Sequence, residues 1–283
     1  MVLVTALWAM AGVVTRQLDQ VRGFEVTFWR SAFTALSLFF FLSVRNGLRF
    51  GQKLPWRSPY FWISGLCWGT MFTAFMMALT LTAVANVLIT LACGPLITAL
   101  LSWLFTANRL PLRTWLAIGI AGAGIALIFT TQIELGEANF LLGVAVALCV
   151  PLASSLQWTL IQKSQTLGLS LDLVPSVLLG AVLSSIVTLP LAWPFQVNAH
   201  DIGLMAFLGA FQLAIPCTLA VMCARVLQAP EVALLALLEV IFGIALAWLG
   251  AHEEPHAPVL IGGSMVLAAL FANEWLGWRQ RHV

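Results

Sequence analysis

Long apolar segments, separated by short polar loops, follow one another along almost the entire chain. A helix of about 20 predominantly apolar residues spans the roughly 30 Å of hydrocarbon in a bilayer. Helices are required there because backbone polar groups in lipid must be satisfied within their own segment. Reading the apolar runs between polar residues gives ten segments, approximately 1–16, 25–44, 59–80, 83–106, 111–131, 139–162, 172–193, 201–225, 230–250 and 257–278. The sequence therefore predicts an all-α membrane protein with ten transmembrane helices in a single transmembrane domain.

The first of these segments is slightly short for a span. Residues 1–15 are apolar but follow no basic stretch, so we do not expect a cleaved signal peptide. Either the first helix begins directly at the membrane surface or the sequence lacks a few leading residues.

The low content of charge agrees with a membrane protein. Charged residues make up 8% of the 283 residues and hydrophobic residues 61%, whereas a soluble globular protein carries about 25% charged residues. A formal net charge of +2 provides neither a basic groove for nucleic acid nor an acidic tail. The expected partners are therefore the lipid bilayer and a small-molecule substrate, and no nucleic acid.

Cysteine and histidine usage predicts neither a metal nor a cofactor. The five cysteines fall inside apolar runs and form no C-x-x-C pair, and the four histidines lie in expected loops or in the C-terminal tail. His252 and His256 are four residues apart with Glu253 and Glu254 between them. A solvated turn explains that pattern better than a metal site does.

Basic residues are distributed unequally between the two expected membrane faces. With a cytoplasmic N-terminus, ten basic residues fall on the cytoplasmic side and two on the other. The ten are Arg45, Arg49, Lys53, Arg57, Arg109, Arg113, Lys163, Arg225, Arg279 and Arg281, and the two are Arg16 and Arg22. Because cytoplasmic loops are enriched in Lys and Arg, both termini are predicted to be cytoplasmic.

The chain also contains an internal repeat. The segment from Gly94 to Asn108 aligns with the segment from Glu239 to Glu253 at an offset of 145 residues, which pairs Trp103 with Trp248. The offset divides the chain into two halves of five helices, 1–131 and 139–278. Five is odd, so the halves have opposite orientations, and such inverted repeats are typical of transporters whose substrate site lies at the midplane between them.

The residues of this repeat resemble a known family. The segment Ala85-Asn-Val-Leu-Ile-Thr-Leu91, with Pro95 and Trp103 before Arg109-Leu-Pro111, resembles the EamA repeat of the drug/metabolite transporter superfamily. The second copy, Leu238-Glu-Val240 with Trp248 and Glu253, resembles it more closely. Family members usually carry a glutamate that closes this helix, which here is Glu253 in the second half and Asn108 in the first.

The resemblance covers essentially the whole chain. It implies the ten-helix layout with two five-helix repeats and both ends inside, in a bacterial inner membrane. The layout is similar to that of the aromatic amino-acid exporters called YddG-like, although no motif in the sequence fixes that subgroup.

Polar residues at membrane depth are the first candidates for function, because burying them is costly. Glu239 lies mid-way along 230–250 and is a candidate for a proton or substrate-ammonium site, or for a hydrogen bond to a neighbouring helix. Asn86 and Thr90 share a helix face with Gly94, which the repeat pairs with Glu239; they either line a cavity or bond helices together. Arg30 is a candidate contact for a substrate carboxylate, or it reaches back to the outer headgroups.

Aromatic and amide side chains complete the candidate cavity. These residues lie in several expected helices and comprise Trp8, Trp68, Phe72, Met76, Gln157, Trp158, Phe211 and Gln212. An aromatic stripe is more often part of the core or faces lipid than it binds a ligand. An aromatic-lined cavity with few polar groups would nevertheless suit an apolar or aromatic substrate.

The leading hypothesis is a secondary transporter, not an enzyme, that exports aromatic or hydrophobic amino acids by alternating access. Other neutral metabolites or drugs are the alternative substrates, in either direction. A Walker A sequence is absent, so direct use of ATP is not expected. A passive channel would need charge rings or a carbonyl filter, and a membrane enzyme would need converging catalytic groups at membrane depth. A monomer and a homodimer both remain open.

Overall fold

The computed structural model describes most of the chain. The described residues are 1–18, 23–47, 50–106, 139–169, 171–227, 229–251 and 257–281, together with 112–113, 115–117, 119–120, 122–124 and 127. The side chains of 102–106, Glu231 and several residues of the last helix lie outside the description, as do residues 252–256 with His252, Glu253 and His256. Within the described residues, every regular element is a helix.

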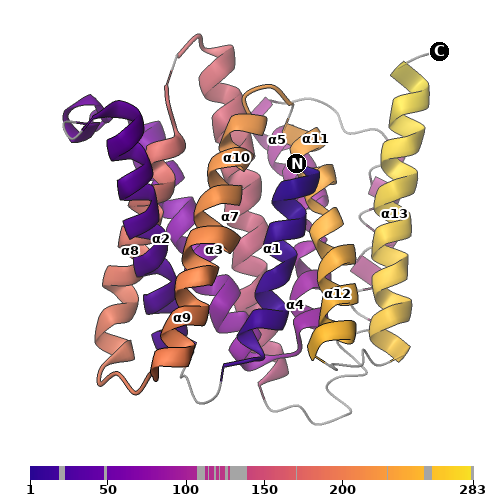
Figure 1. Cartoon of the computed structure of the whole chain (residues 1–283). Helices are drawn as coiled ribbons and strands as arrows, with labels where there is room; N and C mark the ends of the chain where they lie inside the picture. Colours follow the sequence, from indigo (N-terminus) through magenta and orange to yellow (C-terminus); the bar gives the residue numbers. More distant parts are fainter. Residues whose placement is uncertain are drawn as a thin grey trace.

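The helices run side by side in one bundle, and both termini lie toward the same end of it (Figure 1). In chain order they are α1 (Val2–Thr15), α2 (Gly23–Asn46), η1 (Phe50–Lys53), α3 (Pro59–Leu81), α4 (Val84–Leu91), α5 (Gly94–Thr106), α7 (Phe140–Thr166), α8 (Val174–Ala192), α9 (Ala199–Phe207), η2 (Leu208–Ala214), α10 (Ile215–Cys223), α11 (Ala229–Ala236), α12 (Leu238–Ala251) and α13 (Ala257–Arg281).

The structure confirms apolar helices of transmembrane length, although not all ten of the segments expected from the sequence. Seven helical stretches of the described chain are long and apolar enough to span a membrane: Gly23–Asn46, Pro59–Leu81, Val84–Leu101, Phe140–Thr166, Val174–Ala192, Ala199–Cys223 and Leu260–Gly277. Val2–Thr15 and Trp115–Gly124 are shorter apolar helices. Most of the expected segment 111–131 lies outside the described residues. The total of ten, the inverted repeat and the cytoplasmic termini stay predictions.

Two of the expected helices are broken near their middle, at matching positions. Residues 83–106 were expected as one helix, but α4 ends at Leu91 and α5 begins at Gly94. Pro95 explains this break, because a proline has no N–H for the carbonyl four residues earlier and its ring collides with that carbonyl, here that of Leu91. Residues 230–250 are broken at Leu237, between α11 and α12. No proline accounts for this second break.

The two breaks follow the offset of the sequence repeat. Helix α11 begins and ends 145 residues after α4, and the ends of α5 and α12 are also 145 residues apart. The helix breaks thus recur at the same offset as the sequence repeat.

A third irregularity lies between α9 and α10. Residues Leu208–Ala214 form the π-helix η2, and the N–H of Ile215 donates to the carbonyl of Ala210, five residues earlier. Pro216 follows directly, and in an α-helix its ring would collide with the carbonyl of Gln212. The wider π turn relieves this collision without ending the helix.

Small and hydroxyl side chains fasten α8 to α2 and α3. Gly180 of α8 lies against the backbone of Gly65 and Gly69 of α3, so closely that a Cβ atom at position 180 would meet backbone atoms at 2.8–2.9 Å. Near this crossing, the hydroxyls of Ser64 and Ser176 are 2.6 Å apart. The Ser184 hydroxyl lies 2.9 Å from those of both Ser31 and Thr73. Such contacts drive helix association in lipid, where the hydrophobic effect gives no preference for a protein neighbour.

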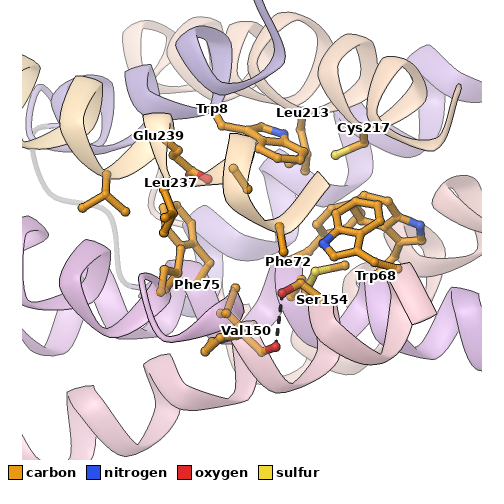
Figure 2. Close-up of a pocket in the computed structure, with 18 of the residues that line it drawn as sticks. Trp8, Trp68, Phe72, Phe75, Val150, Ser154, Leu213, Cys217, Leu237 and Glu239 are labelled. Carbon is orange, nitrogen blue, oxygen red and sulfur yellow. Dashed lines mark hydrogen bonds between the residues drawn. The ribbon is translucent and has the colours of Figure 1, made fainter. Parts of the chain in front are cut away.

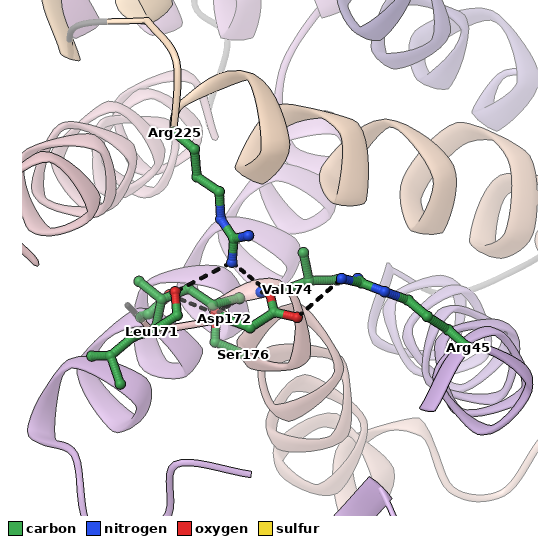
Figure 3. A network of polar contacts seen from close by, with 8 residues as sticks. Arg45, Leu171, Asp172, Val174, Ser176 and Arg225 are labelled. Carbon is green, nitrogen blue, oxygen red and sulfur yellow. Dashed lines mark hydrogen bonds and ion pairs between the residues drawn. The ribbon is translucent and has the colours of Figure 1, made fainter. Parts of the chain in front are cut away.

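Polar contacts also join both ends of α2 to segments between later helices. Near its C-terminal end, Asp172 pairs with Arg45 at 3.4 Å and with Arg225 at 2.6 Å (Figure 3). At the other end, the Glu25 carboxylate accepts the N–H groups of Gln196 and Val197, at 2.8 and 3.0 Å. Both links connect the first half of the chain with the second.

Candidate functional site

A cavity lies in the interior of the bundle, where the broken helices meet α1, α2, α3, α7 and η2. Its volume, measured for the centres of water-sized molecules, is about 110 Å³, whereas one water needs roughly 10–15 Å³ on that measure. The cavity therefore has room for a small solute. In Figure 2, Trp8 and Glu239 lie at the top of the view and Val150 and Ser154 at the bottom.

The helix breaks supply part of the wall. Leu91, Gly94 and Thr98 come from the first break, and Leu237 and Glu239 come from the second. The carbonyl of Gly94, at the start of α5, accepts the hydroxyls of Thr98 and Ser155, at 2.9 and 3.0 Å. Irregular backbone at membrane depth is tolerated where it lines a cavity or is satisfied by protein, as it is here.

Aromatic rings form much of the remaining wall. The five that line the cavity are Trp8, Trp68, Phe72, Phe75 and Trp158. Trp68 packs edge to face on Trp158, with ring centroids 6.0 Å apart, and lies 5.6 Å from Phe72. The indole Nε1 of Trp68 is buried and has no hydrogen-bond partner in the described structure. The wall thus combines a large apolar surface with an unused donor.

Arg30 and Glu239 are the charged residues among those that line the cavity. Arg30 is 2% exposed and comes from the first half of α2. Glu239 lies in the first turn of α12 instead of mid-helix, because the chain breaks just before it. The two side chains line the same cavity, yet they form no ion pair within 4 Å in the described structure. Neither side chain therefore neutralises the other through a direct ion pair.

A hydrogen-bonded chain holds Arg30. The side-chain oxygen of Gln212 accepts both Nε and Nη2 of Arg30, at 3.2 and 3.0 Å. The Gln212 amide nitrogen donates to the backbone carbonyl of Trp8 at 3.1 Å. The guanidinium carbon lies 5.8 Å from the centre of the Phe75 ring. The remaining nitrogen, Nη1, is buried without a hydrogen-bond partner in the described structure.

The structure brings together seven of the residues proposed from the sequence. The seven that line the cavity are Trp8, Arg30, Trp68, Phe72, Trp158, Gln212 and Glu239. The other five lie elsewhere: Met76 and Gln157 are fully buried in the packing, Asn86 and Thr90 are buried in α4, and Phe211 is on the outer surface.

The contacts explain why three of these five residues do not line the cavity. Asn86 and Thr90 were expected on one helix face with Gly94, but the break at 92–93 interrupts that face. Their polar groups are used locally, since Asn86 donates to Thr82 and Thr90 donates to the carbonyl of Asn86. Phe211 is 54% exposed and stacks on Phe207, because its neighbour Gln212 takes the inward direction. The amide of Gln157 has no partner in the described structure, and nothing in its surroundings explains it.

Some lining residues were not proposed from the sequence, among them Thr98, Cys217 and Leu237. Thr98 follows Pro95 by three residues, so the clash rule for proline could have pointed to it. Leu237 could have been found by carrying the same break to the second half at the repeat offset. Cys217 follows Pro216 and had no separate signal.

Comparison with known proteins agrees with this architecture. Residues 1–130 match the family model described as "EamA-like transporter family". One solved crystal structure of a protein superposes with a TM-score of 0.66 at 15% sequence identity, covering 99% of this chain and 96% of the other. That likeness concerns the fold alone. No curated protein matches the sequence. Over residues 1–130, the sequence of the protein is therefore similar to that of the EamA-like transporter family.

Proposed function

We propose that the protein is a secondary transporter that exports amino acids, chiefly aromatic or hydrophobic ones, across the inner membrane. The observation that carries this proposal is the composition of the cavity wall: five aromatic rings with one arginine and one glutamate. A zwitterionic amino acid matches both charges, because its carboxylate suits Arg30 and its ammonium suits Glu239. Its side chain would pack among the rings, which provide most of the apolar contact.

The same wall disfavours other classes of solute. A phosphate ester carries more negative charge than one guanidinium can compensate, and Arg30 is the basic residue among those described in the wall. A neutral apolar drug would offer neither side chain a group of opposite charge, which is unfavourable at membrane depth.

Alternating access is the proposed mechanism. The cavity lies between elements of the two halves, and the breaks of α4/α5 and α11/α12 recur at the repeat offset. Transporters built from inverted repeats place discontinuous helices at a midplane site and rock around it. Two matching breaks give each half an equivalent hinge beside the substrate.

The test is counterflow in liposomes. Purified protein is reconstituted with unlabelled amino acid inside, and uptake of labelled tryptophan, phenylalanine and leucine is followed. Saturable exchange with preference for the aromatic amino acids supports the proposal. Linear, unsaturable flux would indicate a channel, and absence of exchange of any amino acid by folded protein would refute the substrate class.

The energy source is tested at Glu239. If its carboxyl carries a proton during the cycle, Glu239→Gln removes the pH dependence of transport but retains exchange. Asp172→Asn is the control, since it neutralises a carboxylate at the end of the bundle, outside the cavity. A Glu239→Gln variant with the wild-type pH dependence excludes proton coupling at this residue and leaves facilitated diffusion.

A further inference from the structure

The side chain of Gln212 uses both ends of its amide within the protein. Its oxygen accepts two N–H groups of Arg30, and its nitrogen donates to the carbonyl of Trp8. These bonds join η2 to α2 and α1. Gln212 is 2% exposed although it lines the cavity, so the amide is committed to protein partners and has little capacity for a ligand.

The position of Gln212 depends on the local helix geometry. It lies in the π-helix immediately before Pro216, and the π turn changes the direction of its side chain relative to a regular α-helix. π-Helical turns are rare and lie frequently at functional sites. The neighbouring Phe211 faces outward, so the turn directs the amide of Gln212, and not the ring, toward Arg30.

The chemical type of residue 212 determines what charge the cavity presents. An amide oxygen orients the guanidinium but carries no charge, so Arg30 keeps its full positive charge. A buried guanidinium with an unpartnered Nη1 is costly unless an anion approaches it. A carboxylate at position 212 would instead form an ion pair with Arg30 and neutralise its charge before a substrate binds.

We propose that Gln212 is a positioning residue that makes the transporter select substrates bearing a carboxylate. It holds Arg30 in place through a neutral acceptor and thereby keeps the positive charge for the substrate. This inference rests on the proposed transport of amino acids. It adds a rule for specificity: the presence or absence of charge at residue 212 decides between an amino acid and the corresponding amine.

The experiment compares two solutes that differ only in the carboxylate, phenylalanine and phenethylamine. Counterflow of each is measured for wild type, Gln212→Glu and the control Gln165→Glu. Gln165 is an exposed residue near the C-terminal end of α7, so its substitution adds the same charge away from the cavity. Wild type and Gln165→Glu should prefer phenylalanine. In Gln212→Glu the ratio of phenylalanine to phenethylamine transport should fall by about tenfold or more, the usual effect of one charge-assisted hydrogen bond.

A second variant keeps the test decisive if Gln212→Glu does not fold. Gln212→Met has nearly the same length but no acceptor for Arg30, so KM for phenylalanine should rise several-fold with little change in kcat. If Gln212 only fastens the helices together, both substitutions slow both solutes equally and the ratio stays at the wild-type value, which overturns the inference. If the wild-type protein carries neither solute, the proposed amino-acid transport itself is refuted. This outcome differs from an unchanged ratio in the variants, which refutes only the role of Gln212.

Discussion

The close crossing of α8 over α3 allows a sharp test of the fold. At position 180 of α8, a Cβ atom would lie 2.8 Å from the backbone nitrogen of Gly69 and 2.9 Å from the backbone oxygen of Gly65, and would also overlap the Cβ of Trp68. Backbone atoms within α3 have no rotamer by which to move away. In Gly180→Ala, the two helices must therefore separate, which weakens the neighbouring contacts on both sides of the crossing.

The size of the effect follows from two opposing terms. Overpacking a well-packed site costs up to about 3 kcal/mol, while alanine is favoured over glycine inside a helix by about 1 kcal/mol. The expected net loss is therefore about 2 kcal/mol of unfolding free energy. Equilibrium unfolding in mixed detergent micelles, followed by circular dichroism, resolves a change of this size.

Gly203→Ala is the matched control. Gly203 is in α9, and no atom lies within 4 Å of the position its Cβ would take, so only the propensity term acts and the variant should gain up to about 1 kcal/mol. The same substitution thus has opposite signs at two helical sites. The reasoning is refuted if Gly180→Ala is as stable as wild type or more so, because α3 and α8 could then not be in backbone contact.

Three further outcomes are expected. Ser184→Ala removes the partner of Ser31 and Thr73 and should lower the unfolding free energy by roughly 1 kcal/mol; Ser185→Ala, whose hydroxyl bonds within its own helix to Ala181, should change it by much less. Asp172→Asn should reduce the unfolding free energy by less than about 1 kcal/mol because the side chains of its ion pairs are about one-third exposed. In about 1 M salt, which screens the ion pairs, the melting curves of the variant and the wild type should coincide. Trp68→Phe should raise KM for tryptophan counterflow by about tenfold. Trp62→Phe, on the exposed face of α3, should leave this KM unchanged. Equal effects of the two substitutions would exclude the aromatic wall as the binding surface.

The membrane helices were predictable because their signal is a sum over many residues. Apolar length alone located α2, α3, α7 and α8 within a few residues of their observed bounds. Pro95 was also informative, since a proline inside an apolar run kinks or ends a helix, although α7 continues through Pro151 and α8 through Pro190. The seven proposed residues that line the cavity are all aromatic, amide or charged side chains.

Five candidates lie outside the cavity, and for Asn86, Thr90 and Phe211 the reason is that helical phase is not preserved across an irregularity. Asn86 and Thr90 share a face with Gly94 only if the helix is continuous, and a break at 92–93 changes the direction of everything that follows. Phe211 and Gln212 are adjacent, so only one of them could face the cavity, and the π turn that decides between them arises from Pro216 together with the tertiary packing of η2. The break at Leu237 has no local cause and could be inferred only from the repeat.

The hydroxyl pairs between α8 and the first helices bear on the order in which the chain is made. Ser31, Ser64 and Thr73 are synthesised long before Ser176 and Ser184, to which they bond in the finished protein. Until α8 enters the bilayer, these hydroxyls must bond to their own helices or to water at the translocation site. The first half of the chain would thus wait incompletely packed in the membrane, as a target for membrane chaperones and proteases, and only the arrival of α8 would end that exposure.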